Sequence, residues 1–250
     1  MRGVSEAADS AGTANAAGTA DSAGTADAAQ AAEAAEAGPA GEPQTVETVG
    51  TPHGEARITW YRAGRPHTVL ALGHGAGGGI EARDLQALAA ALPPEGVTVA
   101  LVEQPWRVAG RKVAPAPRTL DACWRAVWPQ LTRPGLPVVA GGRSAGARVA
   151  CRTARELGAR SVLALSFPLH PPGKPEKSRA DELTEAGLPV LVVQGGRDPF
   201  GRPEEFPDGT PLVEVPGGDH GFAVPRSAAV SQQEALRVLT SAVIDRLKRE

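Results

Sequence analysis

Short apolar runs rich in Val and Leu recur along this chain, and they limit its possible folds more than any other feature. Runs of this length and composition are typical of strands buried on both faces of a sheet. Segments with the apolar spacing of helices lie between them, so strand and helix alternate. The runs are His67–Gly73, Val97–Glu103, Pro137–Gly141, Ser161–Phe167, Pro189–Gln194 and Pro211–Val215.

The helical patterns complete the predicted fold class. Repeated strand–helix units of this length predict an α/β fold with a mainly parallel central sheet and helices on both faces. An alternating segment, Ala56–Arg62, precedes them and predicts an early antiparallel strand. No cap domain of any size is visible between Ser161 and Pro189, so a fairly open site is expected. Helices are expected around Leu85–Leu92, Leu120–Leu131 with its tryptophans in the core, Ala145–Leu157 ending at Gly158, and from the Ser231–Glu234 capping box onward.

The composition excludes several classes of function. The 250 residues carry a formal net charge of −2, without the basic excess that binding to nucleic acid needs. No apolar run is long enough to cross a bilayer, so no membrane partner is expected. Cys123 and Cys151 lie in helical patterns and are predicted to be buried free thiols, as in a reducing compartment. The N-terminus lacks a hydrophobic signal core, and a cytoplasmic location is predicted.

The first part of the chain differs in kind from the rest. Residues 1–44 are rich in Ala, Gly and Thr and repeat Gly-Thr-Ala at 12–14, 18–20 and 24–26. They hold almost no large apolar side chains, so they cannot offset the entropy lost on ordering. We expect a disordered tail at 1–44 and one folded domain at 45–250.

A nucleophile motif stands after one of the apolar runs. Gly142-Arg143-Ser144-Ala145-Gly146 matches G-x-S-x-G, with a predicted strand before it and a predicted helix after it. In this context the motif forms a strained turn that lifts the serine hydroxyl to the carboxyl edge of the sheet. A plain strand-to-helix turn that needs Gly is the alternative. Ser144 is the predicted nucleophile.

A serine hydroxyl needs a base, and the base needs an acid to orient it. His220 lies in a Gly-rich loop between the last apolar run and the last helix, where a hydrolase of this kind presents its base. Asp198 follows the run Pro189–Gln194, and the order serine, aspartate, histidine suits this architecture. Asp219 is a poorer candidate because adjacent side chains rarely face each other, and Glu103 is a weaker one.

The segment after the first buried run supplies an expected oxyanion hole. It is rich in glycine and can aim a backbone N–H, best that of Ala76, at the developing oxyanion, beside the N–H of Ala145. A phosphate cradle is the competing interpretation, but the G-K-[S/T] sequence of such a loop is missing. His74 is expected to brace this loop rather than act as the base. No metal and no cofactor are predicted.

Four stretches carry a resemblance to a known family. The stretches are GGRSAG at 141–146, FPLHPPGKP at 167–175, QGGRDPFG at 194–201 and GDHGF at 218–222. With them, the chain from 50 to 249 resembles the hydrolase-like domain shared by testis-expressed protein thirty and the non-specific-lethal histone acetyltransferase subunit three (KANSL-three), which is similar to dienelactone hydrolases. The resemblance implies an α/β-hydrolase fold with Ser144, Asp198 and His220 as the triad.

The remaining expectations concern the substrate. Phe167 and His170 lie in a stiff proline-rich segment and, with His74 and Trp106, are predicted to line the pocket, although Trp106 equally suits core packing. Arg143 and Lys174 would favour an anionic substrate if they faced it, but such side chains are more often solvated. We expect a serine hydrolase acting on a small ester or thioester through an acyl-enzyme. The alternative is a non-catalytic interaction module, for which the sequence identifies no protein partner.

Overall fold

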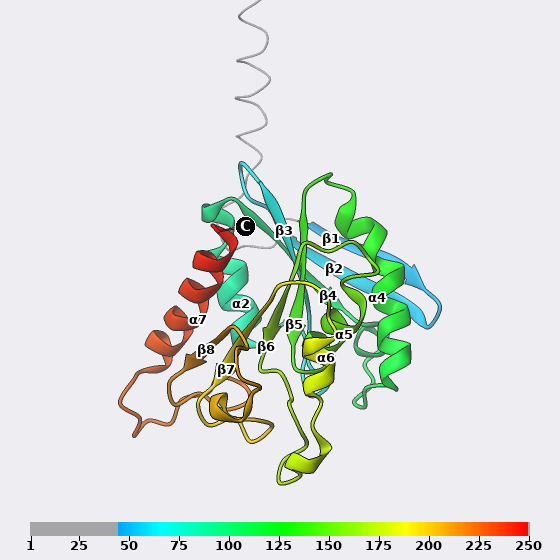
Figure 1. Ribbon diagram of the computed structural model, residues 1–250. Coiled ribbons are helices and arrows are strands. Elements are labelled where there is room, and N and C mark those ends of the chain that lie inside the picture. Colours follow the sequence, from blue (N-terminus) through cyan, green and yellow to red (C-terminus); the bar gives the residue numbers. More distant parts are fainter. Residues whose placement is uncertain (1–44, 250) are drawn as a thin grey trace, which may run out of the picture. The chain divides into compact units, whose positions relative to one another are not determined.

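The computed structural model describes residues 45–249 and shows one twisted sheet between two layers of helices (Figure 1). Its eight strands lie in the order β1-β2-β4-β3-β5-β6-β7-β8. The mainly parallel sheet predicted from the apolar runs is confirmed, because every pairing from β4 to β8 is parallel. The predicted tail lies outside the described residues.

Two antiparallel strands form one edge of the sheet. Strand β1 (Thr45–Thr51) pairs with β2 (Gly54–Tyr61), and β2 in turn runs antiparallel to β4 (Val97–Glu103). The antiparallel strand expected at Ala56–Arg62 is therefore confirmed as β2. The other strands are β3 (Thr68–Gly73), β5 (Val138–Arg143), β6 (Ser161–Leu165), β7 (Val190–Gly195) and β8 (Leu212–Val215).

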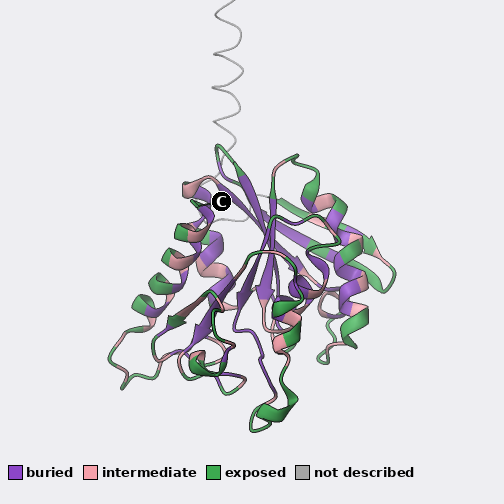
Figure 2. Cartoon of the chain, in the orientation of Figure 1, coloured by how far each residue is buried: buried purple, intermediate pink, exposed green. Residues whose placement is uncertain are grey.

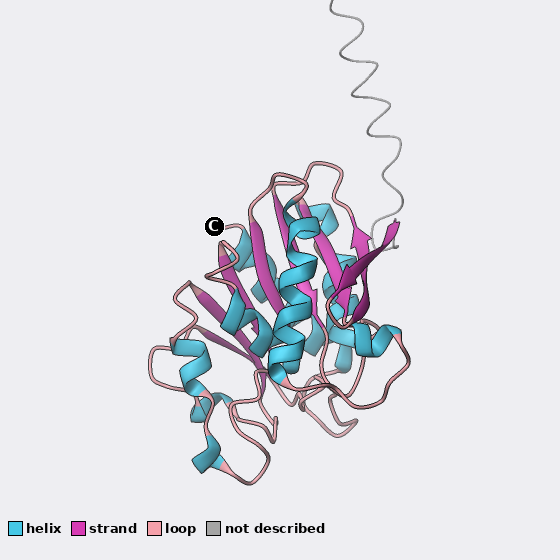
Figure 3. Ribbon diagram, turned by 90° about the vertical axis from the view of Figure 1, so that its right-hand side faces the viewer, coloured by secondary structure: helices cyan, strands magenta, loops and turns pink. Residues whose placement is uncertain are grey.

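Helices cover both faces of this sheet, as Figures 1 and 3 show from two directions. One face carries α4 (Pro117–Thr132), α5 (Ala145–Thr153) and α6 (Ala180–Thr184). The opposite face carries α2 (Arg83–Ala91) and α7 (Gln232–Leu247), which pack against each other. Four short helical elements lie in the loops: η1 (Pro93–Glu95), α3 (Pro105–Val108), η2 (Pro175–Lys177) and η3 (Pro203–Glu205).

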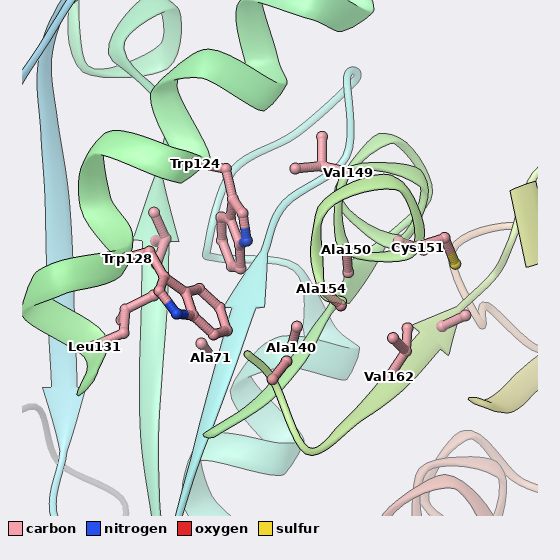
Figure 4. Close-up of a cluster of buried hydrophobic side chains, with 14 of the residues drawn as sticks. Ala71, Trp124, Trp128, Leu131, Ala140, Val149, Ala150, Cys151, Ala154 and Val162 are labelled. Carbon is pink, nitrogen blue, oxygen red and sulfur yellow. The ribbon is translucent and has the colours of Figure 1, made fainter. Parts of the chain in front are cut away.

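The two faces of the sheet have different cores, and both are buried in the centre of Figure 2. Trp124 and Trp128 of α4 fill the first, together with the small residues Ala150 of α5 and Ala154 at its C-terminal cap (Figure 4). The second is built mainly from Leu and Val around α2 and α7. The prediction that the α4 tryptophans belong to the core is confirmed, since they are 1% and 5% exposed.

Several sequence expectations meet the structure at element boundaries. The helix expected over Ala145–Leu157 is shorter: α5 ends at Thr153, and turns lead to Gly158, whose φ of +72° closes them. The capping box at Ser231 and Glu234 forms as predicted.

Between β6 and β7 the chain makes only η2 and α6, so no cap domain covers this part of the sheet. Within the described residues, the two cysteines are free and buried, as expected.

Candidate active site

The carboxyl ends of neighbouring parallel strands bring the predicted residues together at one edge of the sheet. Ser144 follows directly after β5, Asp198 lies in the loop after β7, and His220 lies in the loop after β8. Crevices at this edge are where sheets of this kind bind ligands. The fold therefore accounts for how side chains far apart in sequence come into contact.

Ser144 sits on a strained turn between β5 and α5. Its φ is +54° and its ψ is −109°, a conformation that residues other than glycine rarely adopt. The turn also forces close backbone packing, since a Cβ added at Gly142 would lie 2.6 Å from the carbonyl oxygen of Gly73. Glycine is thus required beside the serine, as the G-x-S-x-G pattern predicted.

The three side chains form a continuous hydrogen-bonded chain. The Ser144 Oγ lies 2.9 Å from Nε2 of His220, and Nδ1 of His220 lies 2.8 Å from Oδ2 of Asp198. A carboxylate only accepts, so Nδ1 donates to Asp198 and Nε2 is left to accept from the hydroxyl. In this arrangement the imidazole can take the serine proton and the carboxylate can stabilise the resulting imidazolium.

Asp198 is completely buried and held from both sides. The Nε2 of Gln194 donates to its Oδ2 at 2.9 Å, and the backbone N–H of Phe200 donates to its Oδ1 at 2.8 Å. The ring of Phe200 lies against His220, with ring centroids 4.2 Å apart. These contacts fix the carboxylate and limit the movement of the imidazole ring.

The loops that carry Asp198 and His220 are joined through their backbones. The N–H of Arg197 donates to the carbonyl of Gly218 at 2.9 Å, and a Cβ added at Gly195 would lie 2.5 Å from that same carbonyl oxygen. The alternative acids are engaged elsewhere. Asp219 accepts two backbone N–H groups within its own turn, and Glu103 pairs with Arg57.

The glycine-rich loop after β3 lies beside the serine. A Cβ added at Gly75 would be 3.4 Å from the Cβ of Ser144, and Ala76 is the next residue. Ala145 is the first residue of α5, where the helix leaves backbone N–H groups unpaired. The loop and the helix start are therefore on the same side of Ser144, as an oxyanion hole formed by Ala76 and Ala145 would require.

His74 braces this loop. Its Nδ1 donates to the carbonyl of Gly75 at 2.9 Å, and its Nε2 accepts the backbone N–H of Gln104 at 3.0 Å. Burial lowers the pKa of His74, despite the hydrogen bond to Gly75, and this keeps the ring in the neutral form that the two bonds require. The ring thus ties the loops after β3 and β4 together.

One small cavity adjoins this loop, and a larger one lies beside it. A small one of about 10 Å³ is lined by His74, Ala76, Ala145 and Trp106, among others. A larger one of about 740 Å³ lies between α3 and the β1–β2 turn. Trp106 and Gln104 line both, so the two cavities are neighbours. Ser144 lines neither of these two cavities, and it is partly exposed.

The other two residues predicted for the pocket are engaged elsewhere. Phe167 is fully buried in the core on the α4–α5 face. His170 is also buried, with Nδ1 bonded to the carbonyl of Pro171 and Nε2 3.1 Å from Oε1 of Glu205. Neither residue lines the two cavities. Both lie after β6 at the expected edge of the sheet, but their side chains turn inward.

The sequence did not anticipate the surroundings of His220. Phe200 was noted only as part of a motif, although its place two residues after Asp198 is a usable signal. Arg143 was expected to be solvated or to attract an anion. Instead it is partly buried, and its Nη2 donates to the backbone carbonyl of His220 at 2.9 Å. Lys174 is exposed, as a solvated side chain would be.

Metal-binding clusters and membrane-spanning helices are both absent from the part of the chain that the structure describes. No cluster of three or more His, Cys, Asp or Glu side chains there has the arrangement that would hold a metal ion. None of the helices between 45 and 249 combines the length and the apolar character that a membrane span needs.

The fold agrees with the comparisons to known proteins. Residues 66–248 match the family described as the alpha/beta hydrolase domain, and the chain belongs to that family. No curated protein matches the sequence. The expected α/β-hydrolase fold, with a mostly parallel eight-stranded sheet and helices on both faces, is therefore confirmed.

Solved structures of hydrolases resemble the whole domain at low sequence identity. An α/β serine hydrolase without a lid from Xanthomonas campestris superposes with a TM-score of 0.66 at 20% identity, covering 82% of this chain and 94% of that one. A serine hydrolase homologue from Coxiella burnetii gives 0.65 at 15% identity, with 82% and 98% covered. Dienelactone hydrolase from Anabaena variabilis gives 0.61 at 18% identity, with 80% and 94% covered. At these identities the likeness is one of fold.

Proposed function

We propose that this protein is a serine hydrolase that cleaves a small ester or thioester through an acyl-enzyme. One observation carries the proposal: the hydroxyl of Ser144, on a strained turn, is hydrogen-bonded to His220, which is hydrogen-bonded to the buried Asp198. A structural serine needs neither the strain nor the aligned pair behind it. The family supports hydrolase chemistry in general.

In the first half of the proposed reaction, His220 Nε2 takes the proton from Ser144 as the Oγ attacks the carbonyl carbon of the substrate. The carbonyl oxygen becomes an oxyanion, which accepts hydrogen bonds from the N–H groups of Ala76 and Ala145. The tetrahedral intermediate then collapses. The bond to the leaving group breaks, and the alcohol or thiol departs with the proton from His220.

In the second half, His220 takes a proton from a water molecule, and the resulting hydroxide attacks the acyl group on Ser144. Collapse of the second intermediate breaks the bond to Oγ, releases the acid and returns the proton to Ser144. Asp198 stays ionised and holds Nδ1–H throughout. The only co-reactant is water, so the reaction requires no bound cofactor.

The shape of the edge supports a small substrate and an open site. The chain between β6 and β7 forms no cap domain, and the cavity beside the glycine-rich loop after β3 is small. We place His74 and Trp106 at that cavity as the proposed pocket wall, since both line it. The narrower resemblance to testis-expressed protein thirty belongs to this proposal, as does a cytoplasmic location, which free buried cysteines favour.

A fluorophosphonate probe and a panel of esters and thioesters test the proposal. We expect the wild-type protein to be labelled and to hydrolyse short acyl substrates, and Ser144→Ala to do neither. Ser178→Ala is the matched control, because that serine is exposed on a loop away from His220. Absence of labelling and turnover in the wild type would favour the alternative, a non-catalytic interaction module. Equal labelling of Ser144→Ala would place the nucleophile elsewhere.

A further inference from the structure

The guanidinium of Arg143 lies between the loops that build the candidate active site. It donates from Nη2 to the backbone carbonyl of His220 at 2.9 Å. Its Nη1 also lies near the glycine-rich loop after β3, because a Cβ added at Gly75 would lie 3.0 Å from this Nη1. Arg143 directly precedes Ser144 in the chain. Its side chain thus lies against both the loop that carries His220 and the glycine-rich loop after β3.

A buried carboxylate stands behind this guanidinium. Asp84, in the first turn of α2, is 0% exposed, and its Oδ2 lies 3.6 Å from Nε of Arg143. The distance is that of a charge contact rather than a hydrogen bond. Burial raises the pKa of the Asp84 carboxyl, and the charge of Arg143 opposes this rise. A charge in such a place is costly unless it is paired, so Asp84 and Arg143 depend on each other.

We propose that Arg143 is a positioning residue for the hydrolysis proposed above, and that Asp84 acts through it by holding the guanidinium in place. Arg143 fixes the backbone of His220, so that Nε2 stays at hydrogen-bonding distance from Ser144. The inference rests on the proposed function only for its kinetic readout. The contact itself joins His220 to α2, which lies on the opposite face of the sheet from α5.

The expected effect follows from the sensitivity of proton transfer to distance. Without Arg143 the His220 loop loses a charged hydrogen bond, and a displacement of about 1 Å between Nε2 and Oγ can cost up to about 100-fold in rate. Substrate binding should change little, because the proposed role of Arg143 is to hold the backbone of His220 and not to contact the substrate. The loss should therefore fall on kcat rather than on KM.

The test compares five variants in hydrolysis of a short p-nitrophenyl ester and in the rate of fluorophosphonate labelling. Arg143→Met should lower kcat and the labelling rate by about 10- to 100-fold, with KM changed less than about 3-fold. Arg143→Lys should recover part of the loss, since lysine can reach only one of the two partners. Asp84→Asn should also be slow, and the double variant should be no slower than Arg143→Met alone.

Arg152→Met is the matched control. Arg152 is a partly buried arginine on α5 that pairs with Asp121 and Glu182 away from the site. Its replacement should leave kcat unchanged even if the melting temperature falls. An equal loss in Arg152→Met, or wild-type kcat and labelling in Arg143→Met, would overturn the proposal. Multiplied losses in the double variant would show that Asp84 does not act through Arg143.

A readout that needs no activity separates this inference from the proposed function. The proton shared between His220 Nδ1 and Asp198 should give a low-field NMR signal, assigned by its absence in His220→Gln. We expect Arg143→Met and, if that variant does not fold, Arg143→Lys to weaken or shift this signal, and Arg152→Met to leave it unchanged. An inactive wild type with this pattern would refute the hydrolase and keep the positioning role. An unchanged signal would overturn the positioning role.

Discussion

Two histidines at the same edge of the sheet, one buried and one partly buried, each face a carboxylate, and they differ in how their ring nitrogens are used. His220 donates from Nδ1 to Asp198, which leaves Nε2 facing the hydroxyl of Ser144. His170 faces an acceptor on each side, the carbonyl of Pro171 and the carboxylate of Glu205. Both of its nitrogens face oxygen acceptors, so neither faces a hydroxyl whose proton it could take.

The comparison teaches that a histidine–carboxylate pair does not by itself mark a base. What distinguishes the pair at His220 is a spare nitrogen aimed at a nucleophile and an acid that is fully buried, whereas the side chain of Glu205 is 39% exposed. We therefore expect the pair formed by His170 and Glu205 to stabilise the loop after β6, and the pair at His220 to act in the reaction.

The largest expected difference is between the two histidines themselves. His220→Ala should lower kcat/KM for a short ester by roughly 10⁴- to 10⁶-fold, because the base is lost. His170→Ala should change it by less than about 5-fold, because neither of its nitrogens faces the proposed nucleophile. Steady-state kinetics on the two variants measure this directly. A loss of similar size in His170→Ala would mean that the second pair also takes part in the reaction.

The carboxylates should differ next. Asp198→Asn should lower kcat by roughly 10³- to 10⁴-fold, because an amide can hold the ring in the wrong tautomer. Glu205→Gln should leave kcat within about 2-fold, since this side chain has no contact with the proposed nucleophile or base. The same kinetic assay serves for both. Wild-type rates in Asp198→Asn would remove this residue from the proposed mechanism.

The two histidine variants should differ in the opposite order in their free energies of unfolding. His170→Ala removes a buried ring with two hydrogen bonds and should lower the free energy of unfolding by about 1–3 kcal/mol. His220 is more exposed, and its replacement by Ala should cost less than about 1 kcal/mol. Urea denaturation followed by circular dichroism measures both. A larger cost for His220→Ala would argue against a structural role for the other pair.

The smallest expected effect is a pH dependence at Glu205. The backbone N–H of Arg202 is the main cause that lowers the pKa of Glu205, and the side chain of His170 adds to it. A lowered pKa in the folded state gives stability above the unfolded value of about 4.3, and this is lost as the pH falls through the folded value. Glu205→Gln should therefore be less stable than wild type at pH 7 by under about 1 kcal/mol, because the group is largely exposed.

Thermal unfolding of wild type and Glu205→Gln across the pH range measures that difference. It should shrink as the pH drops below about 4 and vanish once the wild-type carboxyl is protonated. A difference that stays constant down to acidic pH would mean that the glutamate stabilises the loop through packing rather than through its charge.

The sequence predicted the parts of this molecule that follow local rules. Buried strands can be recognised in a sequence as apolar runs. The strained turn at Ser144 needs small neighbours, and their spacing is visible in the sequence. The order of Ser144, Asp198 and His220 follows from which strands end at the common edge. These features depend on backbone geometry, which the residue types encode directly.

The directions of long side chains could not be predicted in the same way. His170 was expected to line the pocket and Arg143 to be solvated or to attract an anion, but His170 contacts Glu205 and Arg143 contacts the carbonyl of His220. Phe167 turns into the core. The partner of each side chain lies in a loop that is distant in sequence, so no local sequence pattern can predict the contact.

The packing of α7 against α2 has a consequence for synthesis on the ribosome. The apolar stripe of α2, with Leu85 and Leu88, is made early, whereas its cover, with Leu239 and Val243, belongs to the last helix of the domain. A nascent chain can thus contain every residue proposed for the reaction and still expose this stripe, a surface that favours aggregation or chaperone binding. Forms that stop before α7 should be degraded or insoluble rather than merely slow.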